Sequence, residues 1–333
     1  MGTKAKLWMI VFILTLCGIT VLANSSVSVK EASSWQLIGP GGGGHLTSLV
    51  VDNADPDLLF TSVNCGGVRR SFNGGATWEM CNDSFDYAQY GLRAHKIGAL
   101  IQHPTLSQVL LASSHNGQIF TSTDHGTSWQ VSYAVSGAPS GQSFNYFLFD
   151  PANPDTVYTS SGDVIDRLLT PSEHGKEAIK ILNHPILRGQ RQADNQWVWT
   201  VLGELRDFEN NPVPSYSGAV NPQVPQEMFF VTGAGLYRGT IEGDHVTPVL
   251  VDPVQAGLPE KGSFNGGKII FDPRHAGLAF MSVISVSGSG GGFYKSVDAG
   301  QTWHKIIDGL DPKDSNFYDI QFHPTNDQVL YLG

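Results

Sequence analysis

The sequence contains few charged residues, few cysteines and no basic run. Charged residues make up 15% of the chain, and the acidic ones outnumber the basic ones to give a net charge of −10 at pH 7. This balance argues against a nucleic-acid partner, because binding to phosphates needs clustered Lys and Arg. The glycine runs are not followed by a helix signal, which argues against a phosphate-binding loop. No serine or cysteine hydrolase motif is present, and we expect no cofactor.

Only three cysteines occur, which leaves little scope for a disulfide framework. Cys65 and Cys81 each lie eight residues from Asn73, at the centre of a predicted hairpin turn. Residues equidistant from a turn face each other across an antiparallel ladder, so a Cys65–Cys81 disulfide is one prediction. Two unpaired thiols are the alternative, since a single bulge would break this register.

The N-terminus has the features of a secretory signal over residues 1–23. Lys4 and Lys6 precede an apolar run from Leu7 to Val21, and a cleavage site follows Ala23. A transmembrane anchor is the competing interpretation, but the run is short for a span and has no basic stop after it. We therefore expect an exported mature chain, 24–333, in an extracellular or periplasmic compartment, with no stable membrane span.

What the sequence does have is glycine, proline and repetition. Its 38 Gly and 18 Pro favour many turns and short strands, as in an all-β protein. The pattern S-x-[DN]-x-G-x-[ST]-W, called the octapeptide below, occurs at 71–78, 122–129 and 296–303. Asp or Asn, Gly and Trp in this order predict a hairpin turn anchored by the Trp on the sheet. We expect a structural role for Ser71, Asn73, Gly75, Trp78, Ser122, Asp124, Gly126, Trp129, Ser296, Asp298, Gly300 and Trp303.

A second motif, an Asp, Asn or His usually followed by Pro, recurs with a period of about 51 residues. Its six copies begin at Asp52, His103, Asp150, Asn221, Asp272 and His323, with steps of 51, 47, 71, 51 and 51 residues. A repeat of this length with four short apolar runs predicts a β-propeller of four-stranded blades, with strands A to D in chain order. About six blades are begun.

The repeat is irregular in three places. The step of 71 residues predicts an insertion of about 20 residues in the third blade. The chain stops after strand B of the sixth repeat, so we expect that blade to be incomplete and the sequence to be truncated. Residues 34–38 resemble a lone strand D that could complete the last blade.

The octapeptide resembles the Asp-box, or BNR repeat, of β-propeller proteins. A wider resemblance, to xyloglucanase-type glycoside hydrolases and to sortilin-like propellers, rests on the glycine run at 39–44, the turn at 55–57, the segment 66–71 and the octapeptides. The resemblance covers most of the mature chain at the level of the repeats. It implies the propeller fold and is compatible with carbohydrate binding.

In such a propeller the D–A and B–C loops share one face, and the A–B and C–D turns share the other. We expect the ligand on the D–A/B–C face, where His and Asn side chains suit a neutral polyhydroxylated ligand. The alternative is that they only line a wet channel. Zinc is not expected, because no tight ligand spacing supports it. The candidate ligand-binding residues are His45, Asn64, His95, His115, Asn145, Asp163, Asn265 and Asn316.

The resemblance also argues against catalysis. In the xyloglucanase-type enzymes an Asp two residues before a Gly-Gly pair is the catalytic base, and here that position is Asn64. Their general acid comes from a second propeller that this chain lacks, and inverting hydrolysis needs both carboxylates. We therefore predict an exported, non-catalytic propeller that binds a glycan or a protein. A glycoside hydrolase acting on a β-glucan such as xyloglucan, through Asp163 or Glu173, is one alternative. An assembly factor for a membrane complex is another.

Overall fold

The computed structural model describes residues 45–63, 66–83, 85, 96–135, 142–163, 184–259, 264, 266–285, 291–307, 309–310 and 317–333. All of them belong to one compact unit, residues 38–333. The predicted signal (1–23) and the predicted strand at 34–38 lie outside the described residues. No helix among the described residues is long and apolar enough to cross a membrane.

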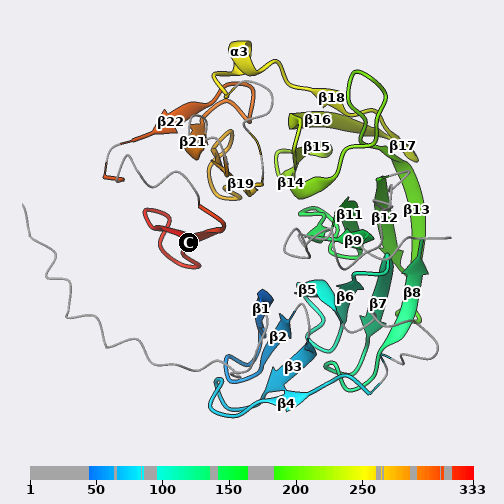
Figure 1. The fold of residues 1–333 in the computed structure, drawn as a ribbon. Coiled ribbons are helices and arrows are strands. Elements are labelled where there is room, and N and C mark those ends of the chain that lie inside the picture. The colour runs from blue at the N-terminus through cyan, green and yellow to red at the C-terminus, as the bar shows by residue number, and fades with distance from the viewer. Residues whose placement is uncertain are drawn as a thin grey trace, which may run out of the picture. The chain divides into compact units, whose positions relative to one another are not determined.

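The strands form six small antiparallel sheets, each built from consecutive segments of the chain (Figure 1). The first contains β1 (Leu46–Val51), β2 (Leu59–Val63), β3 (Gly67–Ser71) and β4 (Glu79–Met80). The second contains β5 (Ile97–Gln102), β6 (Leu110–Ser114), β7 (Gln118–Ser122) and β8 (Gln130–Ala134). The third contains β9 (Gln142–Phe144), β10 (Leu148–Phe149), β11 (Thr156–Asp163), β12 (Pro185–Arg191) and β13 (Trp197–Glu204).

The remaining sheets continue the pattern. The fourth contains β14 (Ser215–Asn221), β15 (Val224–Thr232), β16 (Gly235–Glu242), β17 (His245–Val246) and β18 (Val249–Leu250). The fifth contains β19 (Ile269–Phe271), β20 (Ala279–Val283), β21 (Gly292–Ser296) and β22 (His304–Ile306). The sixth is the pair β23 (Ile320–Phe322) and β24 (Leu330–Leu332). The molecule is thus a β-propeller with five complete blades and the first two strands of another, which confirms the predicted architecture.

Apolar side chains between neighbouring blades form the core. One cluster joins Phe60 of blade 1 to Phe120 and Trp129 of blade 2, and another joins Phe229 of blade 4 to Trp303 of blade 5. Similar clusters join blade 2 to blade 3 and blade 3 to blade 4. Each fully buried large side chain contributes about 1.5–3 kcal/mol relative to exposure. Neighbouring blades are therefore held together by apolar contacts between residues that lie far apart in the sequence.

The residue that begins each motif copy caps its A–B turn. Asp52 Oδ1 accepts hydrogen bonds from the backbone N–H groups of Ala54 and Asp55, at 2.8 and 3.0 Å. His103 Nδ1 accepts equivalent bonds from the N–H groups of Thr105 and Leu106, both at 3.2 Å. A histidine can therefore replace Asp or Asn in this repeat because its ring nitrogen accepts from the same turn.

The register predicted for Cys81 is wrong. The C–D ladder of blade 1 pairs Arg69 with Met80, and the Cys81 N–H donates to the carbonyl of Val68 at 2.9 Å. Cys81 therefore faces Val68, because the octapeptide turn is not symmetric about Asn73. Its thiol is free and buried, and burial raises its pKa to about 11. Cys65 lies outside the described residues.

Candidate functional site

The octapeptide turns use their own polar groups. In the third copy, the Ser296 hydroxyl donates to Asp298 Oδ1 at 2.8 Å and accepts from the N–H of Gly300, also at 2.8 Å. Asp298 in turn accepts from the N–H of Thr302 at 2.9 Å. The copies at 71–78 and 122–129 repeat this pattern. In each copy the Asp or Asn side chain is bonded on several sides within its own turn, which supports a structural role.

The electrostatics of these turns agree with that role. Burial alone would raise the pKa of Asp124, but hydrogen bonds from Ser128 and Ser122 lower it below 3.8 overall. The same balance, with bonds from Thr302 and Ser296, lowers the pKa of Asp298. Both carboxylates are held in the ionised form by donors of the turn. They are therefore poor candidates for a catalytic acid.

The octapeptide tryptophans lie at different depths. Trp303 is 1% exposed and belongs to the cluster between blades 4 and 5. Trp129 is 4% exposed, and its indole N–H donates to the carbonyl of Cys81 in the preceding blade at 3.1 Å. Trp78 is only half-buried, and its N–H donates within its own turn to Gly75. Trp129 and Trp303 thus anchor one blade to another.

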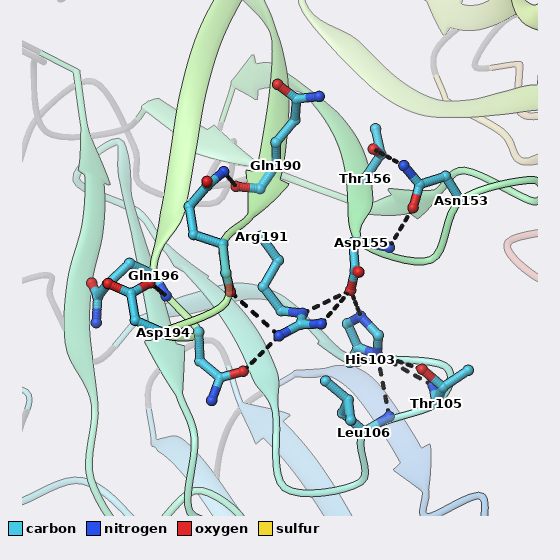
Figure 2. A network of polar contacts seen from close by, with 12 residues as sticks. His103, Thr105, Leu106, Asn153, Asp155, Thr156, Gln190, Arg191, Asp194 and Gln196 are labelled. Atoms are coloured by element: carbon cyan, nitrogen blue, oxygen red, sulfur yellow. Dashed lines mark hydrogen bonds and ion pairs between the residues drawn. The ribbon is translucent and has the colours of Figure 1, made fainter.

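A polar network on the same face joins blades 2 and 3 (Figure 2). The Nε2 of His103 lies 3.2 Å from Asp155 Oδ1, and Arg191 Nε donates to that oxygen at 2.8 Å. Arg191 also donates from Nη1 to Asn195 Oδ1 at 2.7 Å. Nδ1 of His103 accepts hydrogen bonds from its own turn. The ring proton is therefore on Nε2, which donates a hydrogen bond to Asp155 Oδ1. Burial lowers the pKa of His103, although the hydrogen bond to Asp155 opposes this shift.

Sequence reasoning missed a second set of links between blades, made by arginines in strand C. Arg70 Nη1 donates to the carbonyl of His125 at 2.6 Å and to Thr127 Oγ1 at 2.9 Å, in the octapeptide turn of blade 2. Arg188 Nη1 donates to the carbonyl of Gly243 at 2.9 Å, in the C–D turn of blade 4. For Arg70 the available signal was a basic residue directly before the octapeptide Ser71.

The predicted ligand-binding residues are only partly described. His45 is exposed, whereas His115 is 6% exposed and Asn145 is half-buried. Asn145 packs over Gly162, where an added Cβ would lie 2.3 Å from the amide nitrogen. Of the predicted set, His45 is thus the described side chain with an open surface. The rest lie outside the described residues or, for Asp163, have an undescribed side chain: Asn64, His95, Asp163, Asn265 and Asn316.

The strands of blades 2 and 3 carry buried hydroxyl groups. The Ser113 hydroxyl donates to the carbonyl of Phe144 in the next blade at 2.5 Å. In blade 3, Gln142 Nε2 donates to Ser161 Oγ at 3.1 Å, and Ser161 Oγ lies 3.1 Å from His184 Nδ1. Ser161 is 0% and His184 is 3% exposed. A Ser–His pair buried this deeply holds strands together rather than attacking a substrate.

Two D–A loops present exposed aromatic side chains on the face where we predicted the ligand. Phe208, between β13 and β14, is 70% exposed, and Tyr318, between β22 and β23, is 69% exposed. The turn that carries Phe208 is fixed by Asp207, whose Oδ1 accepts from the N–H groups of Glu209 and Asn211 at 2.9 and 2.8 Å. The sequence signal, which the sequence analysis missed, was an aromatic residue beside acidic ones, as in Asp207-Phe208-Glu209 and Tyr318-Asp319.

Comparison with known proteins supports this architecture. No protein-family model matches the sequence. A xyloglucanase from Paenibacillus sp. is 24% identical over 196 residues, which is 54% of this chain and 19% of that protein. The crystal structure of an ancestral GH74 enzyme matches 88% of this chain and 35% of its own, with a TM-score of 0.62 and 15% identity. The chain shares the β-propeller fold of these proteins.

Two further structures extend the comparison. The GH74 xyloglucanase from Xanthomonas campestris matches 77% of this chain and 38% of its own, at a TM-score of 0.52 and 20% identity. YCF48 bound to D1 peptide matches 90% of this chain and 78% of its own, at a TM-score of 0.52 and 14% identity. At these identities the likeness concerns the fold. The chain spans 19% of the curated relative it matches and 35–38% of the GH74 structures.

Proposed function

We propose that this propeller binds a carbohydrate on its D–A/B–C loop face and does not hydrolyse it. The observation that carries the proposal is the pair of exposed aromatic side chains on this face. Phe208 and Tyr318 project from D–A loops with about 70% of their surface exposed, and the Phe208 turn is fixed in advance by Asp207. A flat aromatic ring offers an apolar surface for a sugar ring at little cost in conformational entropy.

The opposite face is less suited to a ligand. The polar groups of the octapeptide turns and of the His103–Asp155–Arg191 network are already bonded to one another. A ligand there would have to break these bonds before making its own. The relationship to a xyloglucanase sequence supports a polysaccharide as the ligand class. A protein ligand in place of a polysaccharide is the alternative.

The absence of hydrolysis rests on the residue at position 64. An inverting glycosidase needs a base and an acid, and an Asn amide cannot take the proton that a carboxylate base would accept. Incubating the chain with xyloglucan and other β-glucans should release no reducing ends above a blank. Release that disappears in an Asp163→Asn variant would instead establish the glycoside hydrolase.

Binding is tested by titrating the chain with xyloglucan oligosaccharides in a calorimeter. Phe208→Ala and Tyr318→Ala should each weaken binding by roughly 2- to 10-fold, because each removes one stacking surface. Phe72→Ala is the matched control, since Phe72 is 59% exposed in an octapeptide turn on the opposite face. Loss of binding in the control alone would refute the assignment of the face. Binding to a protein ligand but to no glycan would favour the alternative.

We also propose that the chain acts outside the cytoplasm. The support is the sequence of residues 1–23, with its basic start, apolar run and small residue at the cleavage site. Expression with this segment should yield a secreted or periplasmic protein whose first residue is Asn24. Amino-terminal sequencing of the exported protein checks the cleavage site.

A further inference from the structure

The outer strand of blade 3 differs from the outer strands of the other blades (Figure 1). β13 is 8 residues long and pairs with β12 on one side, and no described residue pairs with its other edge. From Trp197 to Gly203 it contains no charged residue and no proline. Val198 and Val201 are 53% and 52% exposed along it. Blade 3 therefore presents a long, uncharged and partly apolar strand edge.

The outer strands of the other complete blades are poorly suited to pairing with another chain. β4 has 2 residues, one of them Glu79, and β22 has 3, including Lys305. Strand D of blade 4 is divided into β17 and β18, with Pro248 between them. β8 has 5 residues, and its Ser132 already accepts a hydrogen bond from Trp199 of blade 3. Short, charged or interrupted edges prevent edge-to-edge association of sheets, and β13 lacks these devices.

β13 is held in place from both sides. Its ladder with β12 is regular from Trp197 to Val201, so Trp197, Trp199 and Val201 share one face. Trp197 is 6% exposed in the cluster between blades 2 and 3, and the Trp199 indole N–H donates to Ser132 Oγ at 2.8 Å. On the other face, Leu202 is 1% exposed in the cluster between blades 3 and 4. A strand fixed in this way loses little conformational entropy when its free edge is paired.

We propose that the free edge of β13 pairs with β13 of a second copy of this chain, antiparallel, about a two-fold axis at Thr200. In this register Thr200 lies opposite Thr200 of the other copy. Trp199 of each copy lies opposite Val201 of the other, on the face that these two residues share. Aromatic and β-branched residues are a favourable cross-strand pair. The contact is isologous and adds a strand to the sheet of each blade 3.

Charge favours a second copy in this register. The chain carries a net charge of −10, which opposes the approach of two copies, but β13 has no charge before its last residue, Glu204. Glu204 is paired with Arg206 and would lie beside the uncharged Gln196 of the other copy. A shift of two residues in either direction would set Glu204 against Val198 or against Asp194. The contact does not depend on carbohydrate binding.

The test is analytical ultracentrifugation of the full chain over a roughly hundredfold range of concentration, where we expect a reversible monomer–dimer equilibrium. Thr200→Lys brings two like charges together at the axis and should raise the dissociation constant at least about tenfold, and Thr200→Glu should do the same. An equimolar mixture of these two variants should dimerise again, which misfolded variants could not do. Val249→Lys, at an exposed position of the outer strand of blade 4, is the matched control and should dimerise like the wild type.

Cross-linking tests the register. Residues directly opposite each other in an antiparallel ladder have Cα atoms about 4.5–5.5 Å apart, which is within the range of a disulfide. Thr200→Cys should therefore form a disulfide-linked dimer on oxidation, above the background of the wild type, and Val249→Cys should not. A chain that stays monomeric at every concentration overturns the proposal. So does a dimer that Thr200→Lys leaves unaltered, or a mixture of the two charged variants that stays monomeric.

Discussion

The two faces of the propeller use similar residues for different purposes. On the face of the octapeptide turns, Asp124, Asp298 and His103 are surrounded by donors and acceptors from their own or neighbouring turns. On the loop face, Phe208 and Tyr318 are largely exposed. The residues of the octapeptide face recur from blade to blade because they hold the blades together. The residues of the loop face differ between blades. A recurring polar motif can therefore mark structure, and a side chain that occurs once can mark function.

The largest expected effect is at the tryptophan of the third octapeptide. Trp303→Ala should lower the free energy of unfolding by about 3–5 kcal/mol, because the ring is 1% exposed between two blades. Trp78→Ala should cost clearly less, since Trp78 is half-buried. Denaturant unfolding of both variants measures the difference. Equal losses would show that the ring's position in the motif, rather than its burial, sets its contribution.

The next effect concerns the octapeptide serine. Ser296→Ala should cost about 1–3 kcal/mol, because the buried N–H of Gly300 loses its acceptor. Thr123→Ala, an exposed position of the second octapeptide, is the control and should stay within about 0.5 kcal/mol of the wild type. Thermal or denaturant unfolding distinguishes them. A loss as small as that of the control would mean that the serine is dispensable to the turn.

A smaller effect is the pH dependence that His103 contributes. Burial lowers its folded-state pKa below 6.5, so the unfolded chain binds the additional proton as the pH falls. Stability from this group is therefore present above pH 6.5 and is lost as the pH falls below that value. His103→Asn should remove this dependence while keeping the turn, as Asn221 does in blade 4. Unfolding at pH 7.5 and 5.5 measures it. His45→Asn on the loop face is the control.

The octapeptide carboxylates should affect the stability of the fold at a lower pH than His103 does. Hydrogen bonds hold the pKa of Asp124 and of Asp298 below 3.8 despite the opposing effect of burial. A lowered pKa contributes stability that is present above 3.8 and is lost as the pH falls through the folded-state value. The double variant Asp124→Asn, Asp298→Asn should therefore lose stability less steeply below pH 4. Acid unfolding followed by fluorescence checks this, and an unchanged profile would contradict it.

The smallest effect on stability is expected on the loop face. Phe208→Ala should change the free energy of unfolding by no more than about 0.5 kcal/mol, because the ring is 70% exposed. Its effect on carbohydrate binding should be larger, as proposed above. A large loss of stability with unchanged binding would reverse the comparison between the two faces.

The sequence predicted the parts of the fold that repeat. The octapeptides and the turns that begin at Asp52 and its equivalents rest on local chemistry, in which Asp, Asn, Ser and His bond to backbone a few residues away. Such bonds follow from spacing alone. The predicted pairing of Cys81 with Cys65 across the ladder was wrong, because the turn is not symmetric and places Val68 opposite Cys81. The register of a hairpin depends on the conformation of its turn, and counting residues from the centre of the turn does not reveal that conformation.

The candidate sites were less predictable. The sequence placed His45 and His115 together on the D–A/B–C face, but it did not distinguish the exposed side chain of His45 from the buried one of His115. The exposed ring of Phe208 was found only in the structure. Burial and charge pairing depend on which segments pack on a residue, and those segments lie far away in the chain.

By itself the sequence determined that the chain forms blades, because hairpin turns and capped A–B turns are local and recur. Only the tertiary structure decided which strand C arginines join two blades. Arg70 pairs with Glu79 of its own sheet and, like Arg188, also meets acceptors in the next blade, whereas the hydrogen bond described for Arg238 goes to Glu227 of its own sheet. An arginine pairs with the acceptors that packing brings within reach, which lie 9 and 55 residues away for Arg70 and 11 residues away for Arg238.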